Sequence, residues 1–206
     1  MSEKAAKSQR RYTWSDYRTW NDDKRWEIIG GEVFQMASPT SRHQTISMEL
    51  SVRLHSFFKD KGCRLFSAPM DVVLSEEDVV QPDLLVVCDA NQIKRTHIEG
   101  PPTLVVEIAS GDSGLRDRML KLNLYARSGV KEYWIVTPWP STVEVLLLQG
   151  QKYQVHQVFG KDDTLVSATF PDLQVPLADA FDFPLEPGEE PPVAHEPPAP
   201  RYAATN

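Results

Sequence analysis

Two short apolar runs, each interrupted by a single acidic residue, constrain this chain most. Residues 80–87 and 103–110 are rich in valine and leucine, and each run is bounded by proline or glycine. Apolar residues occupy odd and even positions alike, which is typical of strands buried on both faces of a sheet. Asp83 lies at the start of the first strand and Glu107 near the end of the second. The sequence therefore predicts a central sheet that contains two carboxylates.

These two carboxylates need partners. Burying an ionised carboxyl group costs on the order of several kcal/mol unless it is paired or bound to a metal. If the two strands pair antiparallel, Asp83 and Glu107 lie side by side and repel each other, and a divalent cation is the usual remedy. We therefore interpret Asp83 and Glu107 as a functional pair rather than a structural one.

A helix over residues 113–127 follows the second strand. Its apolar residues recur at three- and four-residue steps, and Ser113 is a suitable N-cap. Asp117 and Lys121 lie one turn apart on one face of this helix, so the Lys121 ammonium group can reach back to the two acids. The alternative is that Asp117 and Lys121 form an ordinary exposed ion pair.

The rest of the chain predicts a mixed α/β (α+β) fold in which helices flank a mixed central β-sheet. A short helix capped by Thr13 and a hairpin turning at Gly30-Gly31 come first, followed by a long amphipathic helix over residues 41–59. A strand over residues 64–74, broken or bulged at Pro69, precedes the central strands. Extra strands over residues 132–136, 142–148 and 152–158 continue the sheet.

Composition limits the setting in which the protein works. The chain of 206 residues has a net charge of -7, the wrong sign for gripping a phosphate backbone over its whole surface. It contains no apolar run of membrane-spanning length and no secretory signal, so we expect a cytoplasmic protein without a membrane partner. Cys63 and Cys88 are interpreted as reduced packing residues.

The predicted domain organisation has three parts. Residues 1–11 form a disordered basic N-terminus, and residues 12–183 form the folded domain. Residues 184–206 are rich in proline and glutamate and nearly lack large apolar side chains, so we expect a disordered tail there.

With these residues in place, the chain resembles the Uma-type family, a branch of the PD-(D/E)XK nuclease superfamily. The resemblance runs from about Tyr12 to Phe181, and its specificity comes from the order of its motifs. They are Tyr12-Thr13-Trp14, Trp26-Glu27-Ile28-Ile29-Gly30-Gly31-Glu32, Ser38-Pro39 with His43-Gln44, Gln81-Pro82-Asp83, Val106-Glu107-Ile108, Asp117 with Lys121, and Gly129-Val130-Lys131-Glu132-Tyr133-Trp134.

The resemblance implies a restriction-endonuclease-like core and roles for individual residues. Asp83 and Glu107, with the Ile108 carbonyl, match the ligands of a divalent metal, Mg²⁺ or Mn²⁺. Ala109 stands where the superfamily usually places its catalytic lysine, so the resemblance implies that Lys121 replaces it.

Four further residues are weaker candidates. Glu32 and His43 match family positions and are expected at the rim of the site. Gln81 precedes the Pro-Asp motif, and Asp117 is expected to orient Lys121 or to act in the outer shell.

The resulting hypothesis is a metal-dependent endonuclease that hydrolyses DNA phosphodiester bonds. A nuclease-fold module that binds DNA or a protein partner without catalysis remains open, as does a metal enzyme acting on RNA or a nucleotide. A homodimer is expected by analogy, because cutting both strands of a duplex usually needs two sites.

Overall fold

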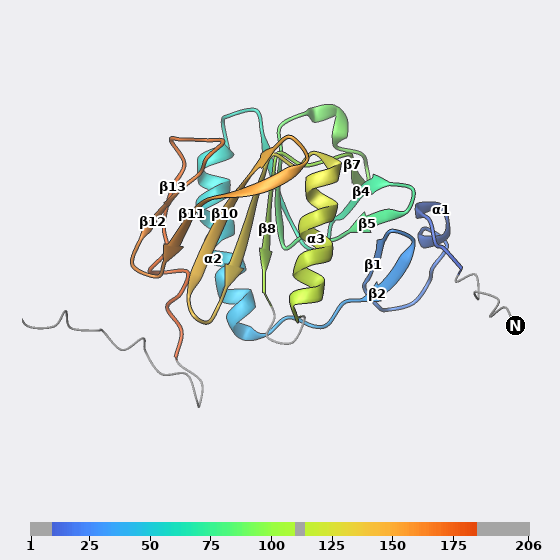
Figure 1. Ribbon diagram of the computed structural model, residues 1–206, viewed down its shortest axis with the longest axis horizontal. Coiled ribbons are helices and arrows are strands. Elements are labelled where there is room, and N and C mark those ends of the chain that lie inside the picture. Colours follow the sequence, from blue (N-terminus) through green and yellow to red (C-terminus); the bar gives the residue numbers. More distant parts are fainter. Residues whose placement is uncertain (1–9, 110–113, 185–206) are drawn as a thin grey trace, which may run out of the picture.

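The computed structural model describes residues 10–109 and 114–184, and of residues 114–117 it describes only the backbone (Figure 1). The predicted cap Ser113, most of the predicted N-terminal segment and all but Pro184 of the predicted tail lie outside these residues. The helices are α1 (Trp14–Tyr17), α2 (Ser41–Phe58), the 3₁₀ turn η1 (Ala90–Gln92) and α3 (Gly114–Ser128). The strands are β1 (Trp26–Ile29), β2 (Glu32–Gln35), β3 (Arg64–Ser67), β4 (Asp71–Ser75), β5 (Asp78–Val80), β6 (Leu84–Val87), β7 (His97–Glu99), β8 (Leu104–Ile108), β9 (Glu132–Thr137), β10 (Thr142–Gln149), β11 (Lys152–Gly160), β12 (Thr164–Val166) and β13 (Gln174–Pro176).

A six-stranded sheet in the order β11-β10-β9-β8-β6-β3 forms the centre of the molecule. Only β8 and β9 pair in parallel within it, with α3 as the crossover between them. Successive residues of β6 point to opposite faces of this sheet. Leu84 belongs to the hydrophobic cluster that contains Leu50 of α2, whereas Leu85 belongs to the cluster that contains Leu124 of α3. The predicted mixed sheet flanked by helices, with central strands buried on both faces, is therefore confirmed.

A second, five-stranded sheet has the order β2-β1-β5-β4-β7. The predicted hairpin forms β1 and β2, and its two turn residues, Gly30 and Gly31, have φ values of 58° and 76°, which favour glycine. The strand predicted over residues 64–74 is in fact two strands in different sheets, because the chain leaves β3 at Ser67 and enters β4 at Asp71.

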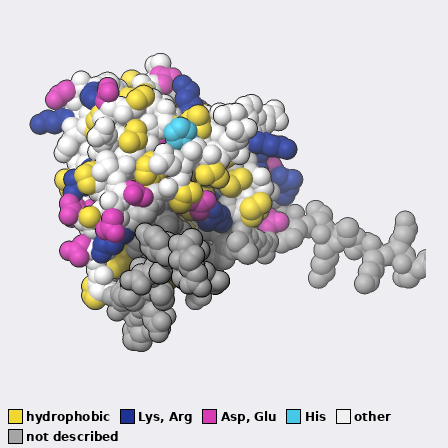
Figure 2. Space-filling model, turned by 60° about the vertical axis from the view of Figure 1, so that its left-hand side comes forward, with side chains coloured by type: hydrophobic (Ala, Val, Ile, Leu, Met, Phe, Trp, Pro, Cys, Tyr) yellow, Lys and Arg dark blue, Asp and Glu magenta, His cyan; other side chains and the backbone are white. Residues whose placement is uncertain are grey.

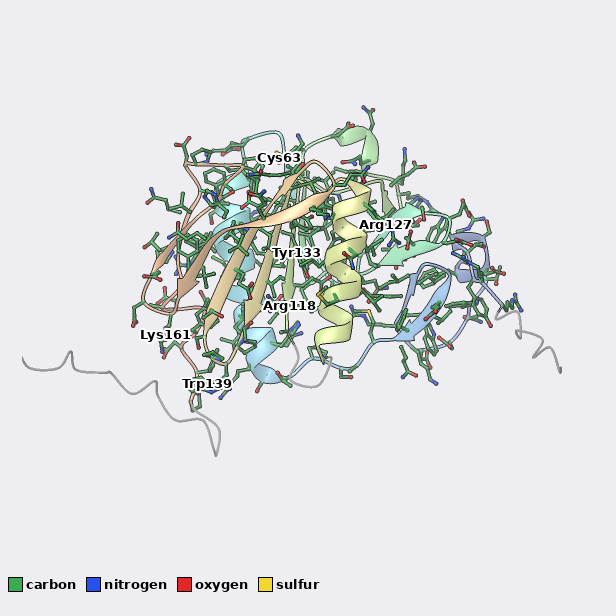
Figure 3. All side chains as sticks on the ribbon, viewed as in Figure 1. Cys63, Arg118, Arg127, Tyr133, Trp139 and Lys161 are labelled. Atoms are coloured by element: carbon green, nitrogen blue, oxygen red, sulfur yellow. A yellow bond between two sulfur atoms is a disulfide. The ribbon has the colours of Figure 1, made fainter. Side chains whose placement is uncertain are left out.

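Helix α3 joins the two sheets (Figure 3). Arg118 reaches β10, where one guanidinium nitrogen lies 2.5 and 2.6 Å from the two carboxylate oxygens of Glu144. Near the other end of the helix, Arg127 binds Asp78 of β5 at 2.6 Å. These ion pairs hold α3 to both sheets, and with it every side chain that α3 presents between them.

The C-terminal part confirms the predicted strands β9 to β11 and adds a hairpin of β12 and β13 that was not predicted. Glu132, at the start of β9, is fully buried. Its carboxylate accepts hydrogen bonds from Trp134 Nε1, Ser167 Oγ and the backbone amides of Ala168 and Thr169. This carboxylate therefore fixes the segment after β12 to the central sheet.

Cys63 and Cys88 form a disulfide, so their interpretation as reduced packing residues was wrong. In the antiparallel pair of β3 and β6, Arg64 lies opposite Val87. One further step in the same register places Cys63 opposite Cys88. The sequence hid this proximity because 25 residues separate the two cysteines.

Among the described helices, none combines the length and the apolar character needed to cross a bilayer.

Candidate functional site

The two acids of the central strands face each other, as the sequence predicted. Leu84 pairs with Val106 in the antiparallel ladder of β6 and β8, so continuing the register by one residue sets Asp83 opposite Glu107. The backbone amide of Ile108 donates to Asp83 Oδ2 at 2.7 Å. Asp83 is thus fixed at the end of the strand that carries Glu107.

Lys121 of α3 completes this group. Its ammonium nitrogen lies 3.0 Å from Glu107 Oε1, and only 6% of the residue is exposed. The alternative of an exposed ion pair therefore fails for Lys121, while the side chain of Asp117 lies outside the described residues. One helical turn after Lys121, the Tyr125 hydroxyl donates to the same Glu107 oxygen at 2.6 Å.

Glu27 of β1 is a fourth member of the cluster, and sequence reasoning did not select it as a site residue. Its Oε1 lies 3.1 Å from Lys121 Nζ and accepts a 2.9 Å hydrogen bond from the Gln81 backbone amide. Glu27 is only 4% exposed. Lys121 thus lies between an acid of each sheet, and we call Glu27, Asp83, Glu107 and Lys121 the acid–lysine cluster.

Burial raises the pKa of Glu107 to about 8, although the Lys121 charge opposes the shift. The neighbouring carboxylates of Asp83 and Glu27 raise this pKa further, and the Tyr125 hydrogen bond lowers it. Burial also raises the pKa of Tyr125 well above its usual value, so Tyr125 stays a hydroxyl donor. The cluster has more acid than its one lysine neutralises, which is the setting that attracts a cation.

His43 approaches Asp83 from α2. The Thr40 side chain caps this helix by accepting from the His43 backbone amide, and His43 Nε2 lies 3.1 Å from Asp83 Oδ1. The other ring nitrogen, Nδ1, is buried and has no hydrogen-bond partner among the described residues. His43 therefore contacts an acid of the cluster directly, closer to the centre than the rim where the sequence suggested it.

Gln81 lies behind Glu27 and organises a second polar group. Its side-chain amide donates to the Tyr17 hydroxyl at 3.1 Å and to Asp71 Oδ1 at 2.8 Å, and its carbonyl accepts from Arg25 Nε at 2.8 Å. Because the Gln81 backbone binds Glu27, this residue connects the N-terminal helix α1 to the acid–lysine cluster.

Glu32 is not part of this arrangement. It is exposed on β2, and its partner across the hairpin is Ile29. The acid that β1 and β2 supply to the cluster is Glu27, five residues earlier.

The described residues contain no group of three or more His, Cys, Asp or Glu side chains arranged to hold a metal ion. Two carboxylates and a backbone carbonyl nevertheless match the all-oxygen ligands that Mg²⁺ prefers, since this ion keeps several of its waters. The contacts to Glu107 described above all involve Oε1. The donor set therefore fits a hydrated Mg²⁺ bound through Asp83 and Glu107.

Comparison with family models identifies the group. Residues 14–178 match the model of the Uma2 family, whose description is "Putative restriction endonuclease". The chain belongs to the Uma2 family. This membership supports a nuclease and confirms the resemblance that the sequence motifs suggested.

A curated protein and a solved structure are also similar to this chain. A protein of Synechocystis, "Uncharacterized protein slr1290", is 26% identical over 126 residues, which cover 59% of this chain and 66% of the relative, just under two thirds of its length. The crystal structure of "a putative nuclease belonging to DUF820" from Anabaena variabilis has a TM-score of 0.68 at 21% identity, and the match covers 82% of this chain and 97% of that one. The second comparison shows that this member of the Uma2 family shares the fold of that protein.

Proposed function

We propose that the protein is a metal-dependent endonuclease that hydrolyses DNA phosphodiester bonds at the acid–lysine cluster. One observation carries the proposal: the buried Lys121 ammonium lies 3.0 Å from Glu107, which faces Asp83 across two paired strands. Two acids and a lysine lie together here, although Ala109 occupies the strand position at which the nuclease superfamily usually has its lysine. Membership of the Uma2 family supports the same reaction class.

In this proposal Asp83, Glu107 and the Ile108 carbonyl hold Mg²⁺. A bound Mg²⁺ would polarise a phosphate oxygen and lower the pKa of its water. The Ile108 amide keeps Asp83 in place, and the Tyr125 hydroxyl does the same for Glu107. Both acids are therefore oriented before any ligand arrives, which reduces the cost of organising the site.

Lys121 supplies the positive charge that stabilises the phosphorane-like transition state or orients the attacking water. Glu27 fixes the ammonium group from the opposite side, and the Gln81 amide fixes Glu27. Water attacks phosphorus as the bond to the leaving oxygen breaks, and the water proton passes to solvent or to a cluster carboxylate. Glu27 and Gln81 act here as positioning residues, whereas Lys121 contacts the reacting atoms.

A cleavage assay on supercoiled plasmid, linear duplex, single-stranded DNA and RNA with Mg²⁺ or Mn²⁺ tests the proposal. We expect metal-dependent cutting of DNA that Asp83→Asn abolishes. Asp172→Asn, in the exposed turn before β13, is the matched carboxylate control and should cut normally. Equal cutting by wild type and Asp83→Asn would remove the cluster from the reaction, and cutting confined to RNA would reassign the substrate.

A second candidate is a non-catalytic module that binds DNA or a protein partner. It is favoured by the internal pairing of the cluster, since Lys121 contacts both Glu27 and Glu107 and His43 contacts Asp83. Such a module would tolerate Asp83→Asn and Glu107→Gln without losing its binding partner. Calorimetric titration with Mg²⁺ separates the two candidates, because only the enzyme requires the metal at the acids.

The cytoplasmic location and the homodimer predicted from the sequence belong to this proposal as well. Sedimentation of the protein with and without duplex DNA measures whether two copies assemble. We expect a dimer on duplex DNA if the two strands are cut together.

A further inference from the structure

The segment from Arg10 to Trp26, which we call the N-terminal arm, differs in charge from the rest of the molecule. It contains five basic residues against three acidic ones, a local charge of +2 in a chain whose net charge is -7. On the face drawn in Figure 2, by contrast, acidic and basic side chains are interspersed. The arm lies at the opposite end of the molecule from the hairpin of β12 and β13 (Figure 1). The arm itself therefore has a local excess of positive charge, and the acidic turn of Glu76 and Glu77 packs against it.

The arm also contains three of the five tryptophans. Its rings form a connected series: the Trp14 and Tyr17 centroids are 5.5 Å apart, Tyr17 and Trp20 are 5.3 Å apart, and Trp20 and Trp26 are 6.1 Å apart. All four side chains are half-buried, so each ring keeps an exposed part. Trp14, Tyr17 and Trp20 pack on a small core beneath the arm, which fixes the series in place.

Two exposed cations lie over the rings at the ends of this series. The Arg18 guanidinium is 6.0 Å from the Trp14 ring centroid, and the Lys24 ammonium is 5.6 Å from that of Trp26. Arg10 and Arg11 are already paired with Asp16 and Glu77. Within the described residues, neither Arg18 nor Lys24 forms an ion pair with a carboxylate. Their positive charge is therefore available to an anionic partner.

A short hydrogen-bonded path leads from the arm to the acid–lysine cluster. The Tyr17 hydroxyl accepts from the Gln81 side chain at 3.1 Å, the Gln81 amide binds Glu27, and Glu27 binds Lys121. These contacts join the base of the arm to the side of the cluster that Glu27 forms.

We infer that the N-terminal arm binds a single-stranded stretch of nucleic acid beside the acid–lysine cluster, with Arg18 and Lys24 on phosphates and Trp20 and Trp26 stacked on bases. Rings alternating with cations are the usual platform for unpaired strands, because each base offers a face for stacking. A duplex hides those faces. The identity of the polymer rests on the proposed function, whereas the location of the surface rests on the arm itself.

The test measures the binding of labelled DNA to the full chain carrying Asp83→Asn, which prevents cutting. Arg18→Ala with Lys24→Ala should weaken the binding of a short single strand by about tenfold at low salt. The salt dependence should lose about 1.4 from its log–log slope, since each contact with a single strand contributes about 0.7. The matched control, Lys161→Ala with Lys152→Ala, removes two exposed lysines outside the arm and should change neither value. Lys161 lies at the end of the molecule away from the arm (Figure 3).

A second variant separates stacking from anchoring of the arm. Trp26→Leu should weaken single-strand binding several-fold, whereas Trp26→Phe should restore most of it, with unchanged thermal unfolding in both. Equal binding by the arm variant and the lysine control would overturn the inference. So would a loss confined to the duplex, or a poly-glutamate peptide that binds the arm as tightly as DNA.

The outcomes distinguish this inference from the proposed function. If wild type cuts no nucleic acid but the arm variants lose single-strand binding, the inference stands and the nuclease proposal fails. If wild type cuts DNA and the arm variants bind it normally, the nuclease proposal stands and the inference fails.

Discussion

Glu107 and Glu132 are buried carboxylates on neighbouring strands of one sheet, and the protein satisfies them in opposite ways. Each oxygen of Glu132 accepts two hydrogen bonds from fixed, neutral donors at 2.6 to 3.2 Å. Glu107 is instead held through one oxygen by a lysine and a tyrosine, among further acids that raise its pKa. A carboxylate has about four acceptor sites, and Glu132 uses all of them within the protein.

This difference shows that burial alone does not mark a functional acid. Hydrogen bonds within the protein occupy the acceptor sites of the Glu132 carboxylate, so its role is structural. The surroundings of Glu107 leave an excess of negative charge, which a metal ion would relieve under the proposed function. Four predictions test this contrast, beginning with the largest effect.

Substitution of each acid by its amide should separate the two in a cleavage assay. We expect Glu107→Gln to slow single-turnover cleavage by about 10²- to 10³-fold, because the metal loses a charged ligand and Lys121 loses a counterion. Glu132→Gln should retain the wild-type rate per folded molecule. If both amides cut at the wild-type rate, Glu107 has no part in the reaction.

The same two substitutions should reverse their order when stability is measured by urea unfolding. Glu132→Gln should lower the free energy of unfolding by about 2 to 4 kcal/mol, because an amide group turns a donor toward backbone amides that already donate. Near pH 4.5, Glu107→Gln should change it by less than about 1 kcal/mol, because Glu107 is already neutral in the folded protein there and Lys121 keeps Glu27 as a partner. A larger loss from Glu107→Gln than from Glu132→Gln would contradict the structural role of Glu132.

His43 should have a smaller effect on catalysis, through the orientation of Asp83. We expect His43→Ala to reduce cleavage by about tenfold, the factor that corresponds to 1.4 kcal/mol, and to raise the Mg²⁺ concentration needed for half-maximal rate. His43→Gln, which offers an amide donor near the Nε2 position, should recover part of the loss. His55→Ala, on an exposed part of α2, is the control and should leave both quantities unchanged.

The pH dependence of stability tests whether Glu107 titrates within the fold. The pKa of Glu107 is raised from 4.5 to about 8, so between these values the folded protein binds the proton that the unfolded chain has released. The contribution of Glu107 to the free energy of unfolding is fully present below pH 4.5 and is lost as the pH rises toward about 8. Wild type should therefore lose stability across this window relative to Glu107→Gln, as measured by urea unfolding at its two ends. Parallel curves for the two proteins would show that Glu107 does not titrate there.

The sequence patterns of the two central strands and of the following helix predicted the centre of the site, because strand pairing and helical spacing determine how Asp83, Glu107 and Lys121 lie. Two strands that are apolar at both odd and even positions pair in a register that sets Asp83 opposite Glu107. The spacing of residues along the following helix places Lys121 on the face toward Glu107. The roles of these residues, of Ile108 and of His43 remain predictions. The resemblance to the family added the argument for Lys121, because Ala109 removes the usual lysine.

The site residues that the sequence analysis did not select depend on how distant elements pack. Glu27 lies in a hairpin that joins the other sheet, and no local pattern records which acid of that hairpin faces Lys121. Glu27 lies beside Ile28 and Ile29 in a buried strand, a signal equivalent to the one that drew attention to Glu107. Tyr125 was counted only as an apolar residue of the helix, although it follows Lys121 by one turn. The three-residue strands β12 and β13 are too short for periodicity to predict.

The chain between the two sheets is as short as three residues, Gln81-Pro82-Asp83, which connect β5 to β6. The first of them holds Glu27 of the smaller sheet and the last binds Ile108 of the larger one. The acid–lysine cluster is consequently assembled only when both sheets have docked. Under the proposed nuclease function, a partly folded chain would have no competent centre, and folding itself would act as a safeguard for nucleic acid near the nascent chain.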